Sequence, residues 1–170
     1  KKAYIEIPEQ LINLEIKNKL FISSTRVFNG YRNINVDEKT APNPNDGLSE
    51  LIAKFENNVM QFKDNKILRL SGIVNEESNF IKATLKRAEN DVVDNKFINA
   101  IHVEDVAKII QEQVNLSNKS QIINGVVPSS ERYSDFSKHV INNDPVNANV
   151  QSLQYNSNFN FKYKDIKSLL

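Results

Sequence analysis

The stretch Lys19-Leu20-Phe21-Ile22-Ser23-Ser24 decides which fold the sequence predicts. An apolar run between polar ends is typical of a strand in a sheet that is covered on both faces. Similar short runs follow at residues 66–70, 97–103 and 120–127, and stretches with helical spacing of apolar residues separate them. Strands and helices that alternate at this length predict an α/β fold with a parallel, Rossmann-like sheet.

The segments between these strands complete the predicted organisation. Helical periodicity predicts helices over about 9–18, 48–60, 77–88, 105–116 and 133–141. A long polar loop is expected over 29–46, and the weakly patterned, Asn-rich stretch 142–160 indicates a mobile surface segment. Because no interdomain linker is visible, residues 1–170 are interpreted as a single α/β domain or as a fragment of one.

Composition excludes several classes of function. The chain has 22 basic and 21 acidic residues, a net charge of +1, which favours neither nucleic acid nor an anionic membrane as partner. It has no Cys and two His, so we expect no metal site. No stretch reaches the roughly 18 apolar residues that a membrane span needs. We therefore expect a cytoplasmic protein with a small-molecule substrate.

The residues that follow the predicted strands are the natural candidates for a site. In an open parallel sheet, ligands bind beyond the carboxyl ends of the strands. Here these positions hold Ser23-Ser24-Thr25, Ser71-Gly72, His102 and Pro128-Ser129. Any chemistry at this edge must come from hydroxyls, carboxylates or amines, because the chain has no thiol.

Five segments, in the right order, resemble the NAD-dependent epimerase/dehydratase family, the extended short-chain dehydrogenases. They are Phe21–Phe28, Arg69–Ile73, Ile98–Ala107, Ile122–Ser129 and Phe161–Leu170, similar to the family's SSxxVYG, RxxGIYGP, xNRIHVDDVA, YNVVDDxPxS and FxYPDYREGL. The resemblance covers residues 19–170 and is nearest the atypical, sugar-nucleotide-epimerase-like subgroup. It implies the C-terminal half of the family's fold, without the Gly-rich turn that binds the dinucleotide. NAD or NADP is expected only with an N-terminal half, and no cofactor is expected for this chain alone.

The resemblance also implies roles for individual residues. They are catalytic Ser24, cofactor-binding Ser23, Ser71 and Gly72, and substrate-binding Thr25 and His102. The family's catalytic Tyr and Lys align with Asp46 and Glu50. Two carboxylates cannot supply a phenolate and its cationic partner, so the usual acid–base mechanism is not expected.

Several of these side chains also have structural interpretations. Ser24 fits a turn equally well, and a lone His such as His102 is more often packed in the core than catalytic. Asp105 fits the cap of the helix that follows it, and an ion pair is a more frequent role than phosphate binding for Arg69. The apolar face of residues 48–60 fits the core better than a homodimer interface.

Three hypotheses follow for the function. The first is an NAD(P)-dependent epimerase/dehydratase-like protein that acts on a nucleotide sugar or a related hydroxyl or carbonyl substrate and is catalytically degenerate. The second is a non-catalytic binding or scaffold relative of that family. The third is an unrelated small α/β binding domain.

Overall fold

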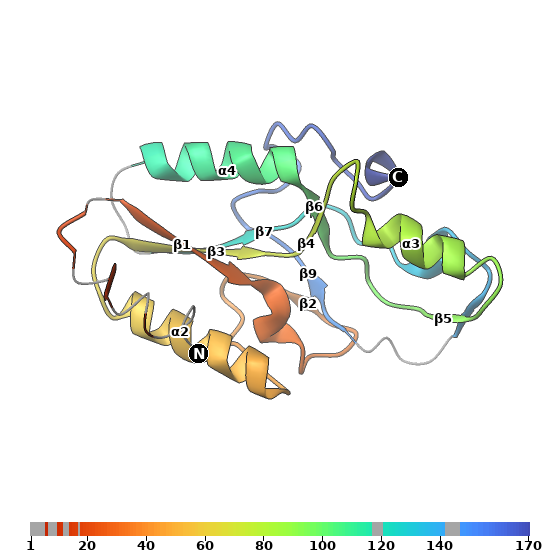
Figure 1. Cartoon of the computed structure of the whole chain (residues 1–170), viewed down its shortest axis with the longest axis horizontal. Helices are drawn as coiled ribbons and strands as arrows, with labels where there is room; N and C mark the ends of the chain where they lie inside the picture. The colour runs from red at the N-terminus through yellow and green to blue at the C-terminus, as the bar shows by residue number, and fades with distance from the viewer. Residues whose placement is uncertain (1–5, 7–9, 12–13, 17, 117–120, 142–146) are drawn as a thin grey trace.

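A three-stranded parallel sheet forms the centre of the molecule (Figure 1). The computed structural model describes residues 6, 10–11, 14–16, 18–116, 121–141 and 147–170. The strands are β1 (Lys19–Ser24), β3 (Asn65–Leu70) and β7 (Gln121–Gly125), in the order β1-β3-β7. Both pairs are parallel, which confirms the predicted α/β fold. No helix among the described residues is long and apolar enough to cross a membrane.

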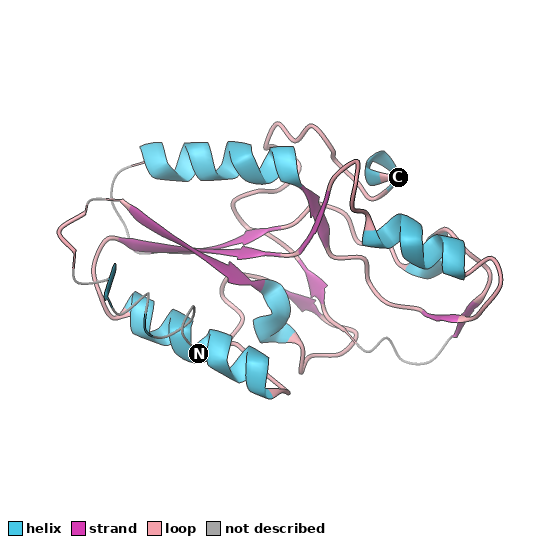
Figure 2. Cartoon of the chain, in the orientation of Figure 1, coloured by secondary structure: helices cyan, strands magenta, loops and turns pink. Residues whose placement is uncertain are grey.

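Helices α2 (Gly47–Met60) and α4 (Val103–Asn115) cover opposite faces of this sheet (Figure 2). Because side chains alternate along a strand, each strand contributes to both faces. Phe21 and Ile67 pack against the Phe55 and Val59 side of α2, so the apolar face of residues 48–60 belongs to the core. On the other face, the α4 side chains pack against Leu68 and Ile123, and Leu20 packs partly against the same cluster.

The remaining strands form short parallel pairs beyond the sheet. They are β4 (Gly72–Val74) with β6 (Ala100–His102), β2 (Asn35–Val36) with β9 (Asn149–Val150), and β5 (Val93–Asp94) with β8 (Val140–Ile141). The third helix, α3 (Phe80–Arg87), follows β4, and three short 3-10 helices complete the chain: η1 (Thr25–Phe28), η2 (Tyr133–Asp135) and η3 (Lys167–Leu169).

Helix α4 begins two residues earlier than the sequence predicted, because His102 and not Asp105 caps it. The Nδ1 atom of His102 accepts the backbone N–H of Glu104 at 3.3 Å. Asp105 is fully buried in the first turn, where its carboxylate accepts the backbone N–H groups of Lys162 at 2.8 Å and Tyr163 at 3.0 Å. The prediction of a cap at Asp105 was wrong, since this carboxylate fastens the C-terminal segment to α4.

Two other local predictions were also wrong. The helix expected over 133–141 is instead η2 followed by β8, because Val140 and Ile141 pair with β5. The stretch 142–160 is not a mobile segment where it is described, since Ala148, Val150 and Tyr155 are buried. Residues 142–146 lie outside the described part of the chain, as do residues 9, 12, 13 and 17 of the helix expected over 9–18. Of the other residues of that expected helix, 10–11 are helical, whereas 14–16 and 18 are not.

Candidate functional site

A first cavity of about 290 Å³ lies at the carboxyl ends of β1 and β3. Ser24, Thr25 and Arg26 line one side of it, and Ser71 and Gly72 line the other. These two groups of residues follow neighbouring parallel strands, so the sheet itself brings them together. The cavity thus brings together residues that follow two of the predicted strands.

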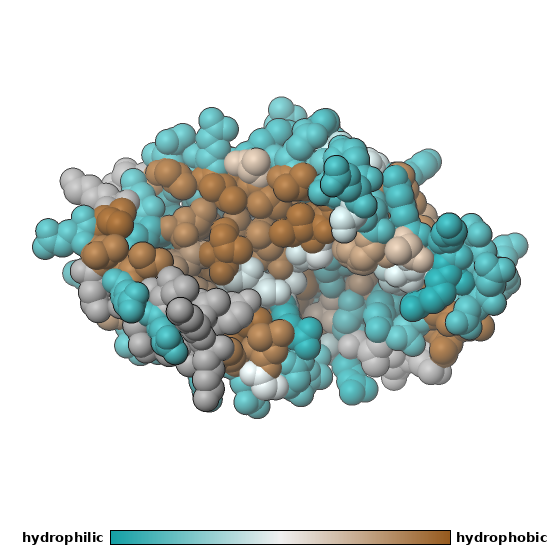
Figure 3. Space-filling model, in the orientation of Figure 1, coloured by the Kyte–Doolittle hydropathy of each residue, from teal (hydrophilic) through white to brown (hydrophobic). Residues whose placement is uncertain are grey.

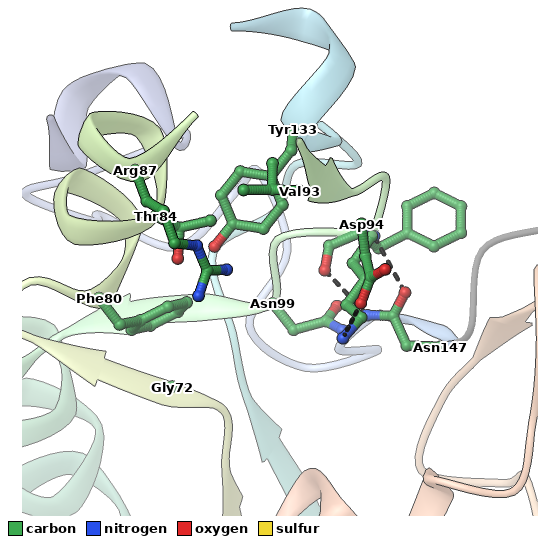
Figure 4. Close-up of a pocket in the computed structure, with 11 residues that line it drawn as sticks. Gly72, Phe80, Thr84, Arg87, Val93, Asp94, Asn99, Tyr133 and Asn147 are labelled. Atoms are coloured by element: carbon green, nitrogen blue, oxygen red, sulfur yellow. Dashed lines mark hydrogen bonds and ion pairs between the residues drawn. The ribbon is translucent and has the colours of Figure 1, made fainter. Parts of the chain in front are cut away.

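A second cavity of about 440 Å³ lies between α3, β5 and η2 (Figure 4). Thr84 and Arg87 of α3 point into it from one side, facing the ring of Tyr133. Lys96 also lines it and forms an ion pair with Asp94 at 2.9 Å. Burial raises the pKa of the Tyr133 phenol, although its hydrogen bond with Thr84 and the nearby cations oppose this. The cavity therefore combines basic side chains with a neutral phenol.

The two cavities adjoin, because Gly72, Asn99 and Asn147 line both of them. The amide of Asn99 donates to the carbonyl of Ala148 and accepts the N–H of Val150, both at 2.9 Å. Asn147 forms the same kind of reciprocal pair with the backbone of Phe97, at 2.9 and 3.0 Å. The amides of Asn99 and Asn147 therefore bond to the backbone as a neighbouring strand would. These hydrogen bonds connect the two walls of the joined cleft.

Asp46, which aligns with the family's catalytic Tyr, is the N-cap of α2. Its carboxylate accepts the backbone N–H groups of Leu48 at 3.0 Å and Ser49 at 2.9 Å, and it pairs with the guanidinium of Arg26 at 2.8 Å. The hydrogen bond from the Ser49 backbone, followed by Arg26, lowers the pKa of Asp46 to about 2. A carboxylate held in this way is a poor base near neutral pH. Glu50, at the Lys position, is exposed in the first turn of the same helix.

Four of the predicted site residues line the first cavity, and their contacts are structural as well. Ser24 accepts the N–H of Arg26 at 3.2 Å and so caps η1. Ser71 donates to the carbonyl of Gly125 at 2.9 Å, which ties β3 to β7. Gly72 lies under the ring of Phe80, where a Cβ atom would come within 2.4 Å of the ring. Thr25 is the fourth of these residues and also lines the first cavity.

The other two predicted residues, Ser23 and His102, do not line either cavity. Ser23 is buried beneath α2 and donates to Glu56 at 2.6 Å. His102 is buried at the start of α4, where its ring stacks on Tyr163 with a centroid distance of 3.9 Å. Their positions favour structural roles over contact with a cofactor or a substrate.

The glycines of the chain do not form a dinucleotide cradle. The Phe80 ring covers Gly72, the side chain of Leu70 covers Gly125, and Asn43 covers Gly30. Gly47 is open but follows the carboxylate of Asp46, which would repel a pyrophosphate. The four glycines thus provide no backbone cradle for the pyrophosphate of NAD or NADP, and we derive no chemical step through it.

Comparison with known proteins shows the fold. No protein-family model and no curated protein matches the chain. A conserved protein of unknown function from Silicibacter pomeroyi superposes with a TM-score of 0.69 at 14% identity, over 88% of this chain and 63% of its own. The UDP-N-acetylglucosamine 4-epimerase from Methanobrevibacter ruminantium gives 0.64 at 17%, over 89% and 59%. The dTDP-4-dehydrorhamnose reductase from Bacillus anthracis, solved with NADP, gives 0.61 at 19%, over 79% and 56%.

The TM-scores show that the chain shares its fold with these epimerase and reductase structures. The chain spans only about three fifths of the length of these structures.

Sequence reasoning missed the residues of the second cavity. Tyr133 was placed in a helix over 133–141 that does not form, and the helix expected over 77–88 carried no residue that indicated a site. The cavity exists only because α3 and η2, about fifty residues apart in sequence, approach each other. Neither segment carries a motif that indicates a ligand, so no local signal could have found it.

Proposed function

We propose that this chain is the substrate-binding part of an NAD(P)-dependent epimerase/dehydratase-like protein and that it has lost the Tyr-Lys mechanism. The observation that carries the proposal is the joined cleft at the strand ends. It has Arg26 at one end and Arg87 and Lys96 at the other. Guanidinium groups suit phosphate oxygens, which they bind through charge-assisted hydrogen bonds. Since Arg26 pairs with Asp46 and Lys96 with Asp94, Arg87 is the group placed to meet the diphosphate of a nucleotide sugar. The sugar would then extend into the first cavity.

The loss of catalysis follows from Asp46. At the position expected to hold a phenol, the Asp46 carboxylate caps the N-terminus of α2 and forms an ion pair with Arg26. A nucleotide sugar bound in the first cavity would find no proton-exchanging phenol at that point. The proposed protein binds its ligand there without turning it over.

Calorimetry with UDP-N-acetylglucosamine tests the proposal. We expect heat of binding for the 170-residue chain, and a dissociation constant raised roughly tenfold by Arg87→Ala, because the variant removes one phosphate contact. Lys82→Ala, on the exposed surface of the same helix, is the matched control and should change nothing. With NADP alone we expect no binding, and with both compounds no epimerised product.

Each component of the proposal can fail by itself. Equal affinities for Arg87→Ala and Lys82→Ala would remove the second cavity from the site. Micromolar binding of NADP to this chain would contradict the assignment of the cofactor to another segment. Turnover of the sugar would show that another group replaces the missing phenol.

A further inference from the structure

A third cavity, of about 300 Å³, is lined by residues that follow β7 and by residues that follow β9. Pro128 and Ser129 lie on its β7 side. The sequence placed these two residues at the edge where ligands of parallel sheets bind, and neither lines the joined cleft. The third cavity is therefore a strand-end cavity that the proposed function leaves without a ligand.

The lining of the third cavity combines hydroxyl groups with aliphatic side chains. Four serines supply the hydroxyls, namely Ser129, Ser130, Ser152 and Ser157. The aliphatic part consists of Val127, Pro128, Val150 and Leu153. Figure 3 shows a purely hydrophobic band elsewhere, over the sheet beside α4. The third cavity is of a different kind, because each apolar wall residue has a hydroxyl or amide group near it in sequence.

The hydroxyl of Ser129 is the unusual group in this lining. It is buried and has no hydrogen-bond partner among the described residues. In contrast, the Ser130 hydroxyl accepts from the amide of Asn149 at 3.0 Å, and the Ser152 hydroxyl donates to Glu38 at 2.8 Å. A buried hydroxyl without a partner lowers stability, so its presence beside a cavity calls for a partner that the chain does not supply.

The charge around the third cavity disfavours anions. The carboxylate of Glu38 lies behind the wall, where it accepts the Ser152 hydroxyl and the backbone N–H of Leu153, both at 2.8 Å. A third hydrogen bond, from the backbone of Asn124 at 2.9 Å, holds this carboxylate in place. Among the described residues, no Lys or Arg lines the cavity to offset the negative charge. A phosphate would be repelled here, whereas Arg87 attracts one in the joined cleft.

We propose that the third cavity binds one neutral sugar ring. Serine hydroxyls both donate and accept hydrogen bonds, as sugar hydroxyls do, and the C–H face of the ring would lie on the aliphatic wall. Rotation about χ1 would turn the Ser129 hydroxyl to the sugar and give it the missing partner. Ligand pockets measure about 300–1,000 Å³, so this cavity suits a single ring. A nucleobase fits less well, because bases stack on aromatic side chains and none lines the cavity.

The third cavity and the joined cleft are separate sites. Val150 is buried and lines both the first cavity and the third, so its side chain stands between them. The inference therefore does not depend on the proposed function.

An NMR titration of the isotope-labelled 170-residue chain tests the inference. The probes are glucose, galactose, mannose and N-acetylglucosamine. We expect at least one of them to shift the amide signals of Ser129 and Ser157, with a dissociation constant on the order of 1 mM, because the sugar exchanges hydrogen bonds with water for similar ones. The 6-phosphate of the same sugar should bind several-fold more weakly, because Glu38 repels it.

Ser129→Ala separates a binding role from a structural one. We expect a dissociation constant raised roughly fivefold, because one hydrogen bond to the sugar is lost. The Tm of the sugar-free chain should stay the same or rise, because a buried hydroxyl without a partner is removed. Ser78→Ala is the matched control, since Ser78 is exposed and lines none of the three cavities. Ser157→Trp, at an exposed position, should block the cavity and abolish the shifts in a folded chain.

Three outcomes would overturn the inference. The first is the absence of shifts with all four sugars at about tenfold above the expected dissociation constant. The second is a set of shifts confined to Ser24 and Gly72, which would place the sugar in the joined cleft and leave the proposed function intact. The third is a lower Tm with unchanged affinity in Ser129→Ala, which would make the hydroxyl structural. Equal affinities for Arg87→Ala and Lys82→Ala would instead count only against the proposed function.

Discussion

The two faces of the β1-β3-β7 sheet are built from different chemistry. On the α2 face, Ser23 and Arg69 lie side by side in register and converge on Glu56, and the Arg69–Glu56 ion pair at 2.6 Å is almost completely buried. On the α4 face, the row of Ile22, Leu68 and Ile123 is aliphatic and ends in exposed Ile22. In the next row, Lys66 and Gln121 donate hydrogen bonds to Gln113 of α4. The α2 face thus contains a buried ion pair, whereas the α4 face combines an aliphatic row, exposed at Ile22, with hydrogen bonds to Gln113.

Breaking the ion pair should produce the largest effect. Glu56→Met leaves the Arg69 guanidinium buried without its partner, which we expect to lower the free energy of unfolding by about 3–5 kcal/mol. The double variant Glu56→Met with Arg69→Met should recover most of that loss, since no charge remains buried. Urea denaturation measures both. A double variant as unstable as the single one would contradict an effect based on charge.

Truncating side chains in the row of Ile22, Leu68 and Ile123 should lower stability more at its buried end than at its exposed end. Leu68→Ala should destabilise the chain by about 2–5 kcal/mol, because it leaves a cavity under α4. Ile22→Ala, in the same row, should cost about 1 kcal/mol or less, because its side chain is half exposed. Equal losses in chemical denaturation would mean that the open end is covered.

Removing the Ser23 hydroxyl should have a smaller effect on the polar face. Ser23→Ala deletes one hydrogen bond to Glu56 while the bonds from Arg69 remain, so we expect a loss of about 1–2 kcal/mol. Thermal unfolding measures this loss. Affinity for UDP-N-acetylglucosamine should not change, and a weakened affinity at unchanged stability would instead assign Ser23 to the ligand site.

Lowering the pH should have the smallest effect on the free energy of unfolding, through the carboxylate that caps α2. The pKa of Asp46 is lowered to about 2 from 3.8, so the stability that its carboxylate supplies is complete above about pH 4. It is lost as the pH falls from about 4 toward 2, when the carboxyl becomes protonated. In Asp46→Asn this part of the acid dependence should disappear, while hydrogen bonds to the helix start remain. An unchanged pH profile between pH 4 and 2 would contradict the assignment.

Local sequence patterns predicted the central elements but failed in the region beyond the sheet. The strands at Lys19–Ser24 and Asn65–Leu70 contain apolar runs, which carry their own signal, although only the second strand is buried throughout. In contrast, β5 and β8 have two residues each and exist only because they pair with each other. A propensity argument over 133–141 therefore predicted a helix where tertiary pairing produces a strand.

The sequence by itself determined the parallel α/β class and predicted the edge of the sheet at which a cavity lies. These depend on periodicity and on aligned residues, both of which are local. The tertiary structure decided what each polar side chain does: Asp46 starts a helix, Asp105 fastens the C-terminal segment, and Ser23 binds Glu56. A hydrogen bond depends on which segments meet in space, and that meeting is set by packing across the whole chain.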